Sequence, residues 1–316
     1  MLDMSGTLDA AVAAEALAGL GRSPKTLPAK LFYDAKGCAL FDAITRLPEY
    51  YPTRTELALL HATVPAIARR VPPRSVLVEY GASSEDKAEI LLEWLQAPAA
   101  YVPIDVAAAA LAALRRRMQA RLPVHPLVAD FLRPLVLPRE VAGHPVFGFF
   151  PGSTIGNLEP DVAICFLQQV RDTLGAGALF LVGVDLRKDP AVLIPAYDDA
   201  AGVTAAFNLN LLARLNREAG AAFDLSSFVH DARWNEQEGR IEMHLVSLRA
   251  QTVRVAGHSV RFEAGESIHT ENSYKHTVGG FIALAARAGW RSAGLWRDAA
   301  GLFSLHLLTT EDRDEA

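Results

Sequence analysis

The stretch SVLVEYGASSEDK (75–87) contains a strand, a sharp turn and the beginning of a helix. Residues 75–80 form an apolar run of strand length, and a helical pattern follows over residues 84–95. Gly81 separates the two, and glycine permits both a tight turn and a close approach of the backbone to a ligand. A strand that leads through glycine into a helix is therefore a candidate ligand-binding turn.

The beginning of the helix over 84–95 offers a place for an anion. Ser83 or Ser84 can cap this helix, whose free N–H groups and positive dipole end favour negative charge, and Lys87 can assist. The turn lacks the second and third glycines of a GxGxxG pattern, and it is not a Walker A loop. An ordinary capped turn explains the same residues equally well, so the turn alone identifies no ligand.

Strands and helices continue to alternate beyond this turn. Short apolar strands are predicted at residues 101–105, 126–130, 146–150 and 179–185, with helices at 107–120 and 160–174. This alternation predicts an α/β fold with a parallel sheet covered on both faces.

The C-terminal part of the chain indicates which type of α/β fold this is. A predicted helix over 277–288 precedes strands at 291–296 and 302–308, which are joined by a short turn containing Asp298 and Gly301. Two adjacent strands with a tight turn form an antiparallel hairpin. A parallel sheet that ends in a hairpin is typical of the Rossmann-like class I methyltransferase fold and not of dinucleotide dehydrogenases.

An insert interrupts the alternation and predicts a second, α+β domain. Residues 190–216 read as a helix broken near Gly202, and three later segments alternate apolar and polar residues as an antiparallel meander would, at 240–248, 252–256 and 259–264. We expect residues 56–187 and 276–316 to form the methyltransferase domain, and residues 1–55 and 188–275 to form a substrate-binding domain.

Acidic residues follow two further strands of the predicted sheet. Asp105 ends the second strand, 24 residues after Gly81, where nucleotide-binding sheets place an acid on the ribose hydroxyls. Asp130 and Phe131 end the third strand, in position to bind the adenine amine and to stack on its ring. Each acid alone is more often a solvated strand end, but together with Gly81 they predict a ligand site at the carboxyl edge of the sheet.

Composition and charge exclude several classes of protein. The 316 residues are 51% hydrophobic, which supports a substantial core, and the net charge is −5. The longest basic run is Arg115–Arg117, so we expect neither nucleic-acid nor membrane binding. The apolar stretch 106–114 is too short to span a bilayer, and the N-terminus lacks the pattern of a signal peptide.

Cysteine and histidine usage points to a cytoplasmic protein without a metal. Cys38, in a loop-like segment, and Cys165, in an apolar helix and expected in the core, cannot form a disulfide framework or a metal cluster. The nine histidines show no metal-binding spacing, and His269 and His276 are too far apart for one helix face. We predict no metal ion and a monomer.

Three longer segments carry a resemblance to a known family: LPEYYPTRTE (47–56), PGSTIGNLEP (151–160) and AYDDAAGVTAAFN (196–208). They resemble the histidine Nα-methyltransferases, which make hercynine, the trimethylated form of histidine, at the entry to ergothioneine biosynthesis. The resemblance runs from about residue 25 to residue 308. The cofactor loop departs from the family's usual GSGxSxK form, with Ala82 and Ser83 in place of Ser-Gly.

The resemblance implies a role for each matching residue. For L-histidine it implies Asn157 and Tyr197 at the carboxylate and α-amine, Tyr50 near the imidazole, and Glu271 and Ser273 at the ring nitrogens. The remaining implied residues line the pocket (Tyr33, Phe41 and Met243) or bind S-adenosylmethionine (Gly81, Lys87, Asp105, Asp130 and Phe131). Without the resemblance, the aromatic residues would be read as core packing and Glu271 as a solvated carboxylate.

The implied reaction is an in-line attack of the neutral α-amine on the sulfonium methyl, with Tyr33 or Tyr197 as alternative proton acceptors. An N-methyltransferase of the same fold acting on another aromatic amino acid, such as a tryptophan derivative, is the nearest rival. A nucleotide-binding protein without methyl transfer and a catalytically silent binding module are further alternatives. Glu271 and Ser273 suit a ring with two polar nitrogens and so favour histidine.

Overall fold

The structure is a computed structural model that describes residues 9–82 and 84–310. The chain divides into two compact units. We call the unit formed by Pro52–Arg187 and Tyr274–Ala316 the large-sheet unit, and the unit formed by Met1–Tyr51 and Lys188–Ser273 the small-sheet unit. Among the described residues, none of the helices is long and apolar enough to cross a membrane.

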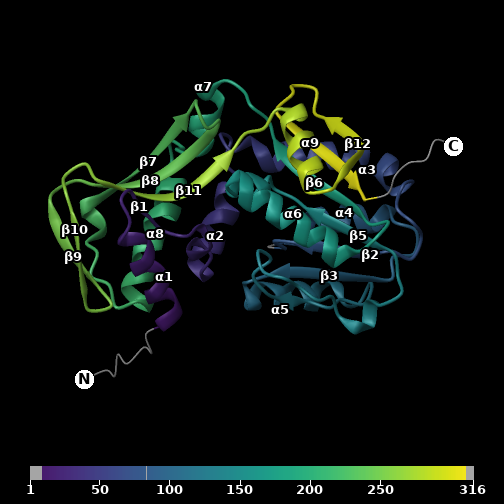
Figure 1. Ribbon diagram of the computed structural model, residues 1–316, viewed down its shortest axis with the longest axis horizontal. Coiled ribbons are helices and arrows are strands. Elements are labelled where there is room, and N and C mark those ends of the chain that lie inside the picture. The colour runs from purple at the N-terminus through teal and green to yellow at the C-terminus, as the bar shows by residue number, and fades with distance from the viewer. Residues whose placement is uncertain (1–8, 83, 311–316) are drawn as a thin grey trace. The chain divides into compact units, whose positions relative to one another are not determined.

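The large-sheet unit contains a seven-stranded sheet (Figure 1). Its strands, in chain order, are β2 (Val76–Tyr80), β3 (Ala100–Asp105), β4 (Leu127–Val128), β5 (Val146–Phe150), β6 (Leu179–Asp185), β12 (Arg291–Arg297) and β13 (Phe303–Thr309). They lie side by side in the order β12-β13-β6-β5-β2-β3-β4. Neighbours from β4 to β6 are parallel, whereas β13 is antiparallel to both β6 and β12. The predicted α/β sheet with a terminal hairpin is therefore confirmed.

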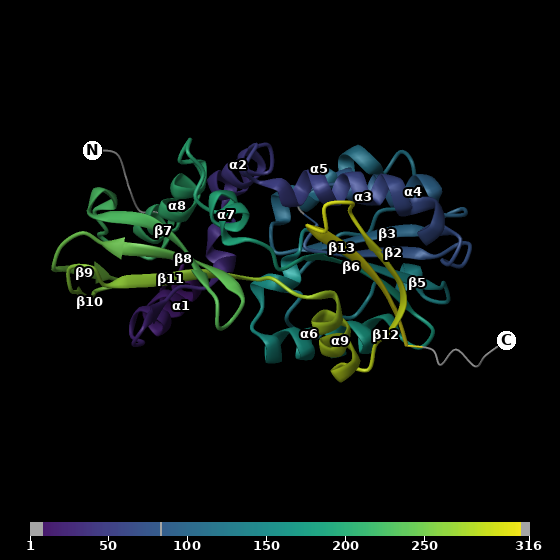
Figure 2. The same ribbon diagram turned by 90° about the horizontal axis from the view of Figure 1, so that it is seen from above.

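Helices cover both faces of this sheet (Figure 2). On one face lie α3 (Tyr51–Ala68), α4 (Asp86–Trp94) and α5 (Ala108–Met118), and on the other lie α6 (Pro160–Leu174) and α9 (Val278–Arg287). Strand alternation divides the core between these faces: Leu77 packs with the first layer, and Val76 and Val78 pack with the second. Because both faces are covered, the strands read as continuous apolar runs, which is why the sequence predicts them well.

The second core layer of the large-sheet unit contacts one buried histidine, His306, and one partly buried histidine, His276. His276 precedes α9 and His306 lies in β13, and both rings contact Phe281. His276 Nε2 and His306 Nδ1 have no hydrogen-bond partner among the described residues. Burial, reinforced by nearby positive groups that include Lys275 and Arg187 for His276, lowers the pKa of each imidazole to about 4. Both rings are therefore neutral at neutral pH.

We expect these histidines to make the protein less stable as the pH falls below about 6.5. An unfolded histidine binds a proton near pH 6.5 and the folded ones only near pH 4, so acid favours the unfolded state across that window, by roughly 1 to 2 kcal/mol per histidine at pH 5. Thermal melting between pH 8 and pH 5 measures this loss. His306→Phe should flatten the profile, and an unchanged profile would contradict the assignment.

The small-sheet unit contains a four-stranded sheet and a separate hairpin (Figure 1). The sheet has the order β1-β11-β8-β7 and the hairpin pairs β9 with β10. Its strands are β1 (Lys25–Thr26), β7 (Phe228–Asn235), β8 (Arg240–Ser247), β9 (Gln251–Val255), β10 (His258–Phe262) and β11 (Ser267–Tyr274). Its α-helices are α1 (Ala10–Leu20), α2 (Ala35–Ile44), α7 (Pro190–Leu193) and α8 (Val203–Glu218). Short 3-10 turns η1 (Ala29–Phe32), η4 (Ile194–Ala196) and η5 (Leu225–Ser227) complete the unit.

The predicted three-stranded meander is wrong. Strand β8 pairs with β7 and lies next to β11, while β9 and β10 form a hairpin of their own. The sequence analysis missed β7 and β11 because many of their residues are polar or charged, as in FVHDARWN and SIHTENSY. Period-two patterns detect strands but do not choose their partners.

Smaller expectations also need correction. Cys165 is exposed on α6, and Cys38 lies within helix α2 and not in a loop. Helix α4 has Glu85 at its N-cap position without a side-chain cap, so Ser84 does not cap it; Ser83 lies outside the described residues. The segment between η4 and α8 is not helical, so Tyr197 ends a 3-10 turn and does not lie within a longer helix.

Candidate active site

The carboxyl ends of β2 and β5 mark the point at which the strand order reverses direction in the large sheet. Ligands of α/β sheets bind at such a switch point. Gly81 follows β2 with φ of 75°, a left-handed conformation suited to glycine, and its N–H donates to the Ile104 carbonyl at 2.8 Å. This bond turns the chain across the end of β3 before α4 begins.

The predicted cofactor residues gather around this turn. A side-chain carbon at Gly81 would lie 3.7 Å from Phe131 Cε1, and Phe131 in turn packs edge-on against Phe150 and Phe166. Asp105 is the last residue of β3, while Asp130 lies two residues beyond the short strand β4. The strand ends therefore bring Gly81, Asp105 and Phe131 to one edge of the sheet.

Each of the two acids accepts a backbone hydrogen bond that fixes its local turn. Asp105 Oδ1 accepts from the N–H of Ala107 at 2.8 Å, and Asp130 Oδ1 accepts from the N–H of Leu132 at 3.0 Å. Burial raises the pKa of Asp105, although the bonds from the backbone N–H groups of Val106 and Ala107 oppose this. A carboxylate with remaining acceptor capacity at a strand end suits a pair of ribose hydroxyls.

Lys87, predicted to assist the cofactor carboxylate, forms an ion pair with Glu56 that the sequence analysis missed. The Glu56 carboxylate lies on α3, is fully buried, and accepts both from Lys87 Nζ and from the N–H of Gly152 at 2.9 Å. A side-chain carbon at Gly183 would lie 2.1 Å from Glu56 Oε1, so β6 leaves room for this carboxylate only because it has glycine there. One buried acid thus connects α3, α4, β6 and the turn after β5.

A second buried acid, Glu79 in β2, lies near this ion pair. Burial raises the pKa of Glu79 to about 8, although the hydrogen bond from the Tyr101 hydroxyl and the charge of Lys87 oppose the rise. Glu79 is therefore mostly protonated at neutral pH, and Glu56 carries the negative charge that balances Lys87.

The turn after β5 carries Asn157, the predicted ligand of the substrate's head group. Asn157 ends the 3-10 turn η3 (Thr154–Asn157), and Ser153 before it adopts a left-handed conformation with φ of 56°. Ser153 Oγ accepts from the N–H of Asp185 at 2.9 Å, and a side chain at Gly156 would lie 2.7 Å from the Tyr274 carbonyl. The sequence GSTIGN therefore has glycines where the backbone requires them, and its turn is fixed against β6 and Tyr274.

The predicted pocket-lining aromatics lie together in the small-sheet unit. Tyr33 and Phe41 meet edge to face at 6.0 Å, Phe41 meets Tyr50 at 6.3 Å, and Tyr50 meets Tyr197 at 6.2 Å. Tyr33 directly follows η1, Phe41 lies in α2, Tyr50 directly precedes α3, and Tyr197 directly follows η4. The rings are therefore far apart in the sequence and meet only after the chain has folded. The faces of such aromatic rings suit a cationic ammonium group.

The remaining predicted substrate residues lie on β8 and β11 of the same unit. The Tyr197 hydroxyl and Ser273 Oγ are 2.7 Å apart in a buried hydrogen bond. Glu271 lies two residues before Ser273 on β11, and Met243 on β8 is buried in the core. The structure therefore brings Ser273 together with Tyr197 and the aromatic cluster, whereas Asn157 and the cofactor residues belong to the large-sheet unit.

Three residues with metal-binding side chains also converge on β8 and β11: Glu242, His244 and His269 offer ligand atoms within 4.8 Å of one another. The Glu242 carboxylate is already bound by Arg240 at 2.8 Å and by Asn235 at 2.9 Å. Burial raises its pKa, but hydrogen bonds from Asn235 and Arg240 more than offset this and hold the pKa at about 2. We interpret the trio as a hydrogen-bonded cluster balanced by Arg240, and the absence of a metal stays a prediction.

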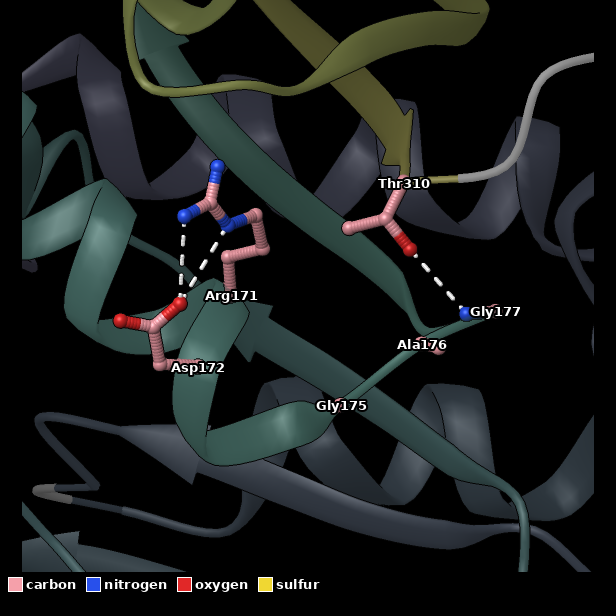
Figure 3. A pocket seen from close by; sticks show the side chains of 6 residues that line it. All are labelled: Arg171, Asp172, Gly175, Ala176, Gly177 and Thr310. Atoms are coloured by element: carbon pink, nitrogen blue, oxygen red, sulfur yellow. Dashed lines mark hydrogen bonds and ion pairs between the residues drawn. The ribbon is translucent and has the colours of Figure 1, made fainter.

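A surface depression of the large-sheet unit lies away from these residues (Figure 3). It is lined by Arg171, Asp172, Gly175, Ala176, Gly177 and Thr310. Arg171 and Asp172 lie in the last turn of α6, residues 175–177 connect α6 to β6, and Thr310 follows β13, so the depression lies at the amino edge of the parallel strands. Because ligands of such sheets bind at the carboxyl edge, we do not assign the active site to this depression.

Sequence profiles of known families identify the fold and chemistry of the chain. The profile described as "Histidine-specific methyltransferase, SAM-dependent" matches residues 12–310. The chain belongs to this family. It is accordingly an S-adenosylmethionine-dependent methyltransferase, as the carboxyl-edge geometry of its large sheet leads one to expect.

Individual relatives agree with this membership. The chain is 44% identical over 319 residues to a "Histidine N-alpha-methyltransferase" of Mycolicibacterium smegmatis, covering 97% of this chain and 98% of the relative. It is 43% identical over 298 residues to the enzyme of the same name from Mycobacterium tuberculosis, covering 92% of each. A crystal structure of an S-adenosylmethionine-dependent methyltransferase from Clostridium acetobutylicum superposes with a TM-score of 0.50, covering 88% of this chain and 98% of that one. At 9% identity it shows the fold alone.

Proposed function

We propose that this family member trimethylates the α-amino group of L-histidine to give hercynine, the first step of ergothioneine biosynthesis. The observation that supports it most is the buried hydrogen bond between Tyr197 and Ser273 beside the aromatic cluster, all within the small-sheet unit. The relatives that share 43% and 44% identity over nearly the whole chain carry the name of this activity.

We assign the cofactor to the large-sheet unit. Gly81 lets the backbone approach it, Asp105 suits the ribose hydroxyls, and Asp130 with Phe131 suits the adenine. Lys87, at the beginning of α4, lies near the free N–H groups of that helix, where the methionyl carboxylate is favoured. When bound, S-adenosylmethionine supplies an electrophilic methyl group on a sulfonium.

We assign the amino acid to Asn157 and to the substrate-binding residues of the small-sheet unit. Asn157 and Tyr197 bind the carboxylate and the α-amine, Glu271 and Ser273 bind the ring nitrogens, and Tyr33, Phe41, Tyr50 and Met243 line the pocket. These side chains orient the neutral amine for in-line attack and exclude bulk water. Tyr33 or Tyr197, directly or through a water, receives the proton that the amine loses and passes its own hydroxyl proton on to solvent. Each further methyl transfer uses the same anchors, because the carboxylate and the ring do not change.

The first experiment identifies the substrate and the methylated atom. The protein is incubated with S-adenosylmethionine and a mixture of amino acids, and the products are read by mass spectrometry. We expect histidine to gain three methyl groups, all placed on the α-nitrogen by fragmentation. A methyl group on the imidazole would contradict the assignment of Asn157 and Tyr197, and methylation of tryptophan derivatives instead of histidine would favour the rival substrate class. Cytoplasmic location and a monomeric state stay predictions.

Asp105→Ala is expected to weaken S-adenosylmethionine binding by roughly tenfold or more, the effect of losing hydrogen bonds to a charged acceptor. The protein should remain folded, because Asp105 lies at a strand end and its carboxylate accepts from the backbone N–H groups of the adjacent turn, at Val106 and Ala107. Calorimetric titration measures the Kd. Asp105→Asn, which keeps one acceptor, should lose less, and Asp172→Ala, an exposed acid of the same unit, should lose nothing. An unchanged Kd for Asp105→Ala would remove this residue from the site.

A further inference from the structure

A chain of buried polar side chains in the small-sheet unit leads to the backbone of Tyr197. It consists of Thr270 on β11, Asn208 on α8 and His230 on β7, all nearly inaccessible to solvent. Thr270 Oγ1 donates to Asn208 Oδ1 at 2.9 Å, Asn208 Nδ2 and His230 Nδ1 are 2.8 Å apart, and His230 Nε2 is 2.8 Å from the Tyr197 carbonyl oxygen.

The direction of the bonds around Asn208 and His230 follows from the backbone carbonyls that these side chains contact. Asn208 Nδ2 also donates to the His244 carbonyl at 3.1 Å, and a carbonyl only accepts, which fixes the orientation of the amide. The second hydrogen of Nδ2 is then donated to His230 Nδ1. His230 therefore carries its proton on Nε2 and donates it to the Tyr197 carbonyl, which also only accepts. A proton on Nε2 and a free lone pair on Nδ1 satisfy both neighbours of the ring.

Tyr197 is consequently held at both ends. Its carbonyl is bound by His230, and its hydroxyl is hydrogen-bonded to Ser273 Oγ. The residue ends the η4 turn, and regular helix resumes only at Val203, where Asp199 accepts from the backbone N–H groups. Between these points the bond from His230 determines where the Tyr197 backbone lies relative to β7.

The same chain of bonds reaches the strand that carries the ring-binding residues. Thr270 immediately precedes Glu271, and its hydroxyl also lies 3.0 Å from the Met243 carbonyl. The position of Tyr197 is thus tied to β8 and β11 through side chains and not only through the backbone. A displacement of about 1 Å in a substrate anchor is enough to cost on the order of a hundredfold in rate.

We propose that His230, oriented by Asn208 and Thr270, is a positioning residue that sets the place of Tyr197 relative to Glu271 and Ser273. The role rests on the proposed function, since it takes Tyr197 as the anchor of the amino-acid head. His230 itself touches the Tyr197 backbone and not the substrate.

A double-mutant cycle tests this assignment. His230→Leu is expected to lower kcat/KM for histidine by roughly tenfold to a hundredfold in the wild-type background, and by less than about threefold in a Tyr197→Phe background, because there the positioned hydroxyl is already missing. The Kd of His230→Leu for S-adenosylmethionine should stay within about twofold of the wild type, because the lost hydrogen bond to Tyr197 involves none of the proposed cofactor residues. His230→Gln, whose amide can donate in place of Nε2–H, should recover most of the activity.

The matched control is Asn216→Ala. Asn216 lies on α8, the helix that also carries Asn208, and the substitution removes its two hydrogen bonds to the backbone of Phe223. It should lower the melting temperature as His230→Leu does, but its effect on kcat/KM should be small and unchanged by Tyr197→Phe. Should His230→Leu fail to fold, Thr270→Val, which removes the donor to Asn208 Oδ1, takes its place in the cycle. Equal losses for the His230 variant in both Tyr197 backgrounds would overturn the proposal.

The wild-type substrate assay separates this proposal from the proposed function. If the wild type did not methylate histidine, the proposed function would be rejected. The His230/Tyr197 double-mutant cycle would then be run on the amino acid that the wild type does methylate. Methylation of histidine together with additive effects of His230 and Tyr197 would leave the function intact and reject the positioning role.

Discussion

Replacing Glu271 by alanine is expected to lower kcat/KM for histidine by roughly tenfold to a few hundredfold, the range for one charged hydrogen bond. In the proposed site its carboxylate accepts from the imidazole N–H, and only a ring that can donate gains this bond. An apolar ring would leave the carboxylate desolvated and unpaired, at a cost of roughly several kcal/mol. Rejection of phenylalanine then depends on this penalty as much as on pocket size, whereas rejection of tryptophan, whose indole N–H can donate, depends mainly on pocket size.

The same variant should lose less activity on apolar aromatic amino acids, and the activity on some of these substrates should increase. Adding Met243→Val, in the buried part of β8, should enlarge the pocket and help larger rings. The measurement is kcat/KM for histidine and tryptophan on the wild type and both variants. Glu266→Ala removes the same charge just before β11, together with its ion pair to Lys25, and should leave the selectivity unchanged. Equal slowing of both substrates by Glu271→Ala would make Glu271 a structural residue.

Glu56→Ala is expected to destabilise the large-sheet unit by about 2 to 4 kcal/mol, somewhat below the range for a fully buried pair because Lys87 is partly exposed. The substitution removes the acceptor of both Lys87 and the Gly152 N–H, so the turn after β5 loses its tie to α3 and α4. We also expect weaker S-adenosylmethionine binding, because Lys87 is no longer held at the beginning of α4.

Thermal melting and calorimetric titration measure the two effects. Glu56→Gln, which keeps an acceptor for Gly152 but loses the charge, should fall between the wild type and Glu56→Ala. Glu89→Ala removes an exposed ion pair with Arg121 on the same helix as Lys87 and should cost less than about 1 kcal/mol. If Glu56→Ala were as stable as Glu89→Ala, the buried carboxylate would not hold these elements together.

The elements that the sequence predicted most closely are those of the large sheet. Strands 146–150 and 179–185 and the helix 160–174 have the predicted bounds, and the C-terminal hairpin lies where expected. For strands buried on both faces and for a helix with one apolar face, the pattern of apolar residues within the segment itself predicts which side chains are buried. Polar strands β7 and β11 carry no such signal and were missed.

Glu56 and Asn208 were not predicted as important, although the sequence around each contains an unusual polar position. Glu56 is an acid that opens an apolar helical run, and Asn208 interrupts the apolar stretch TAAFNLNLLARL. A polar residue at a buried helical position must have a partner, because leaving it unpaired is costly. The polar residue at a buried position predicts that a partner exists. The partners, Gly152 for Glu56 and His230 for Asn208, are far away in the sequence and cannot be identified from it.

The sequence by itself determined the class of the fold, the glycine turn after β2 and the acids at the strand ends, because these depend on local periodicity and on residues adjacent in the chain. Only the tertiary structure decided the position of β13 between β6 and β12, the separate β9–β10 hairpin, and the burial of Glu56 beside Lys87. It also decided the bond from His230 to Tyr197. Each of these depends on which distant surfaces pack together, and that choice is made by shape and by the pairing of buried polar groups, which no local pattern records.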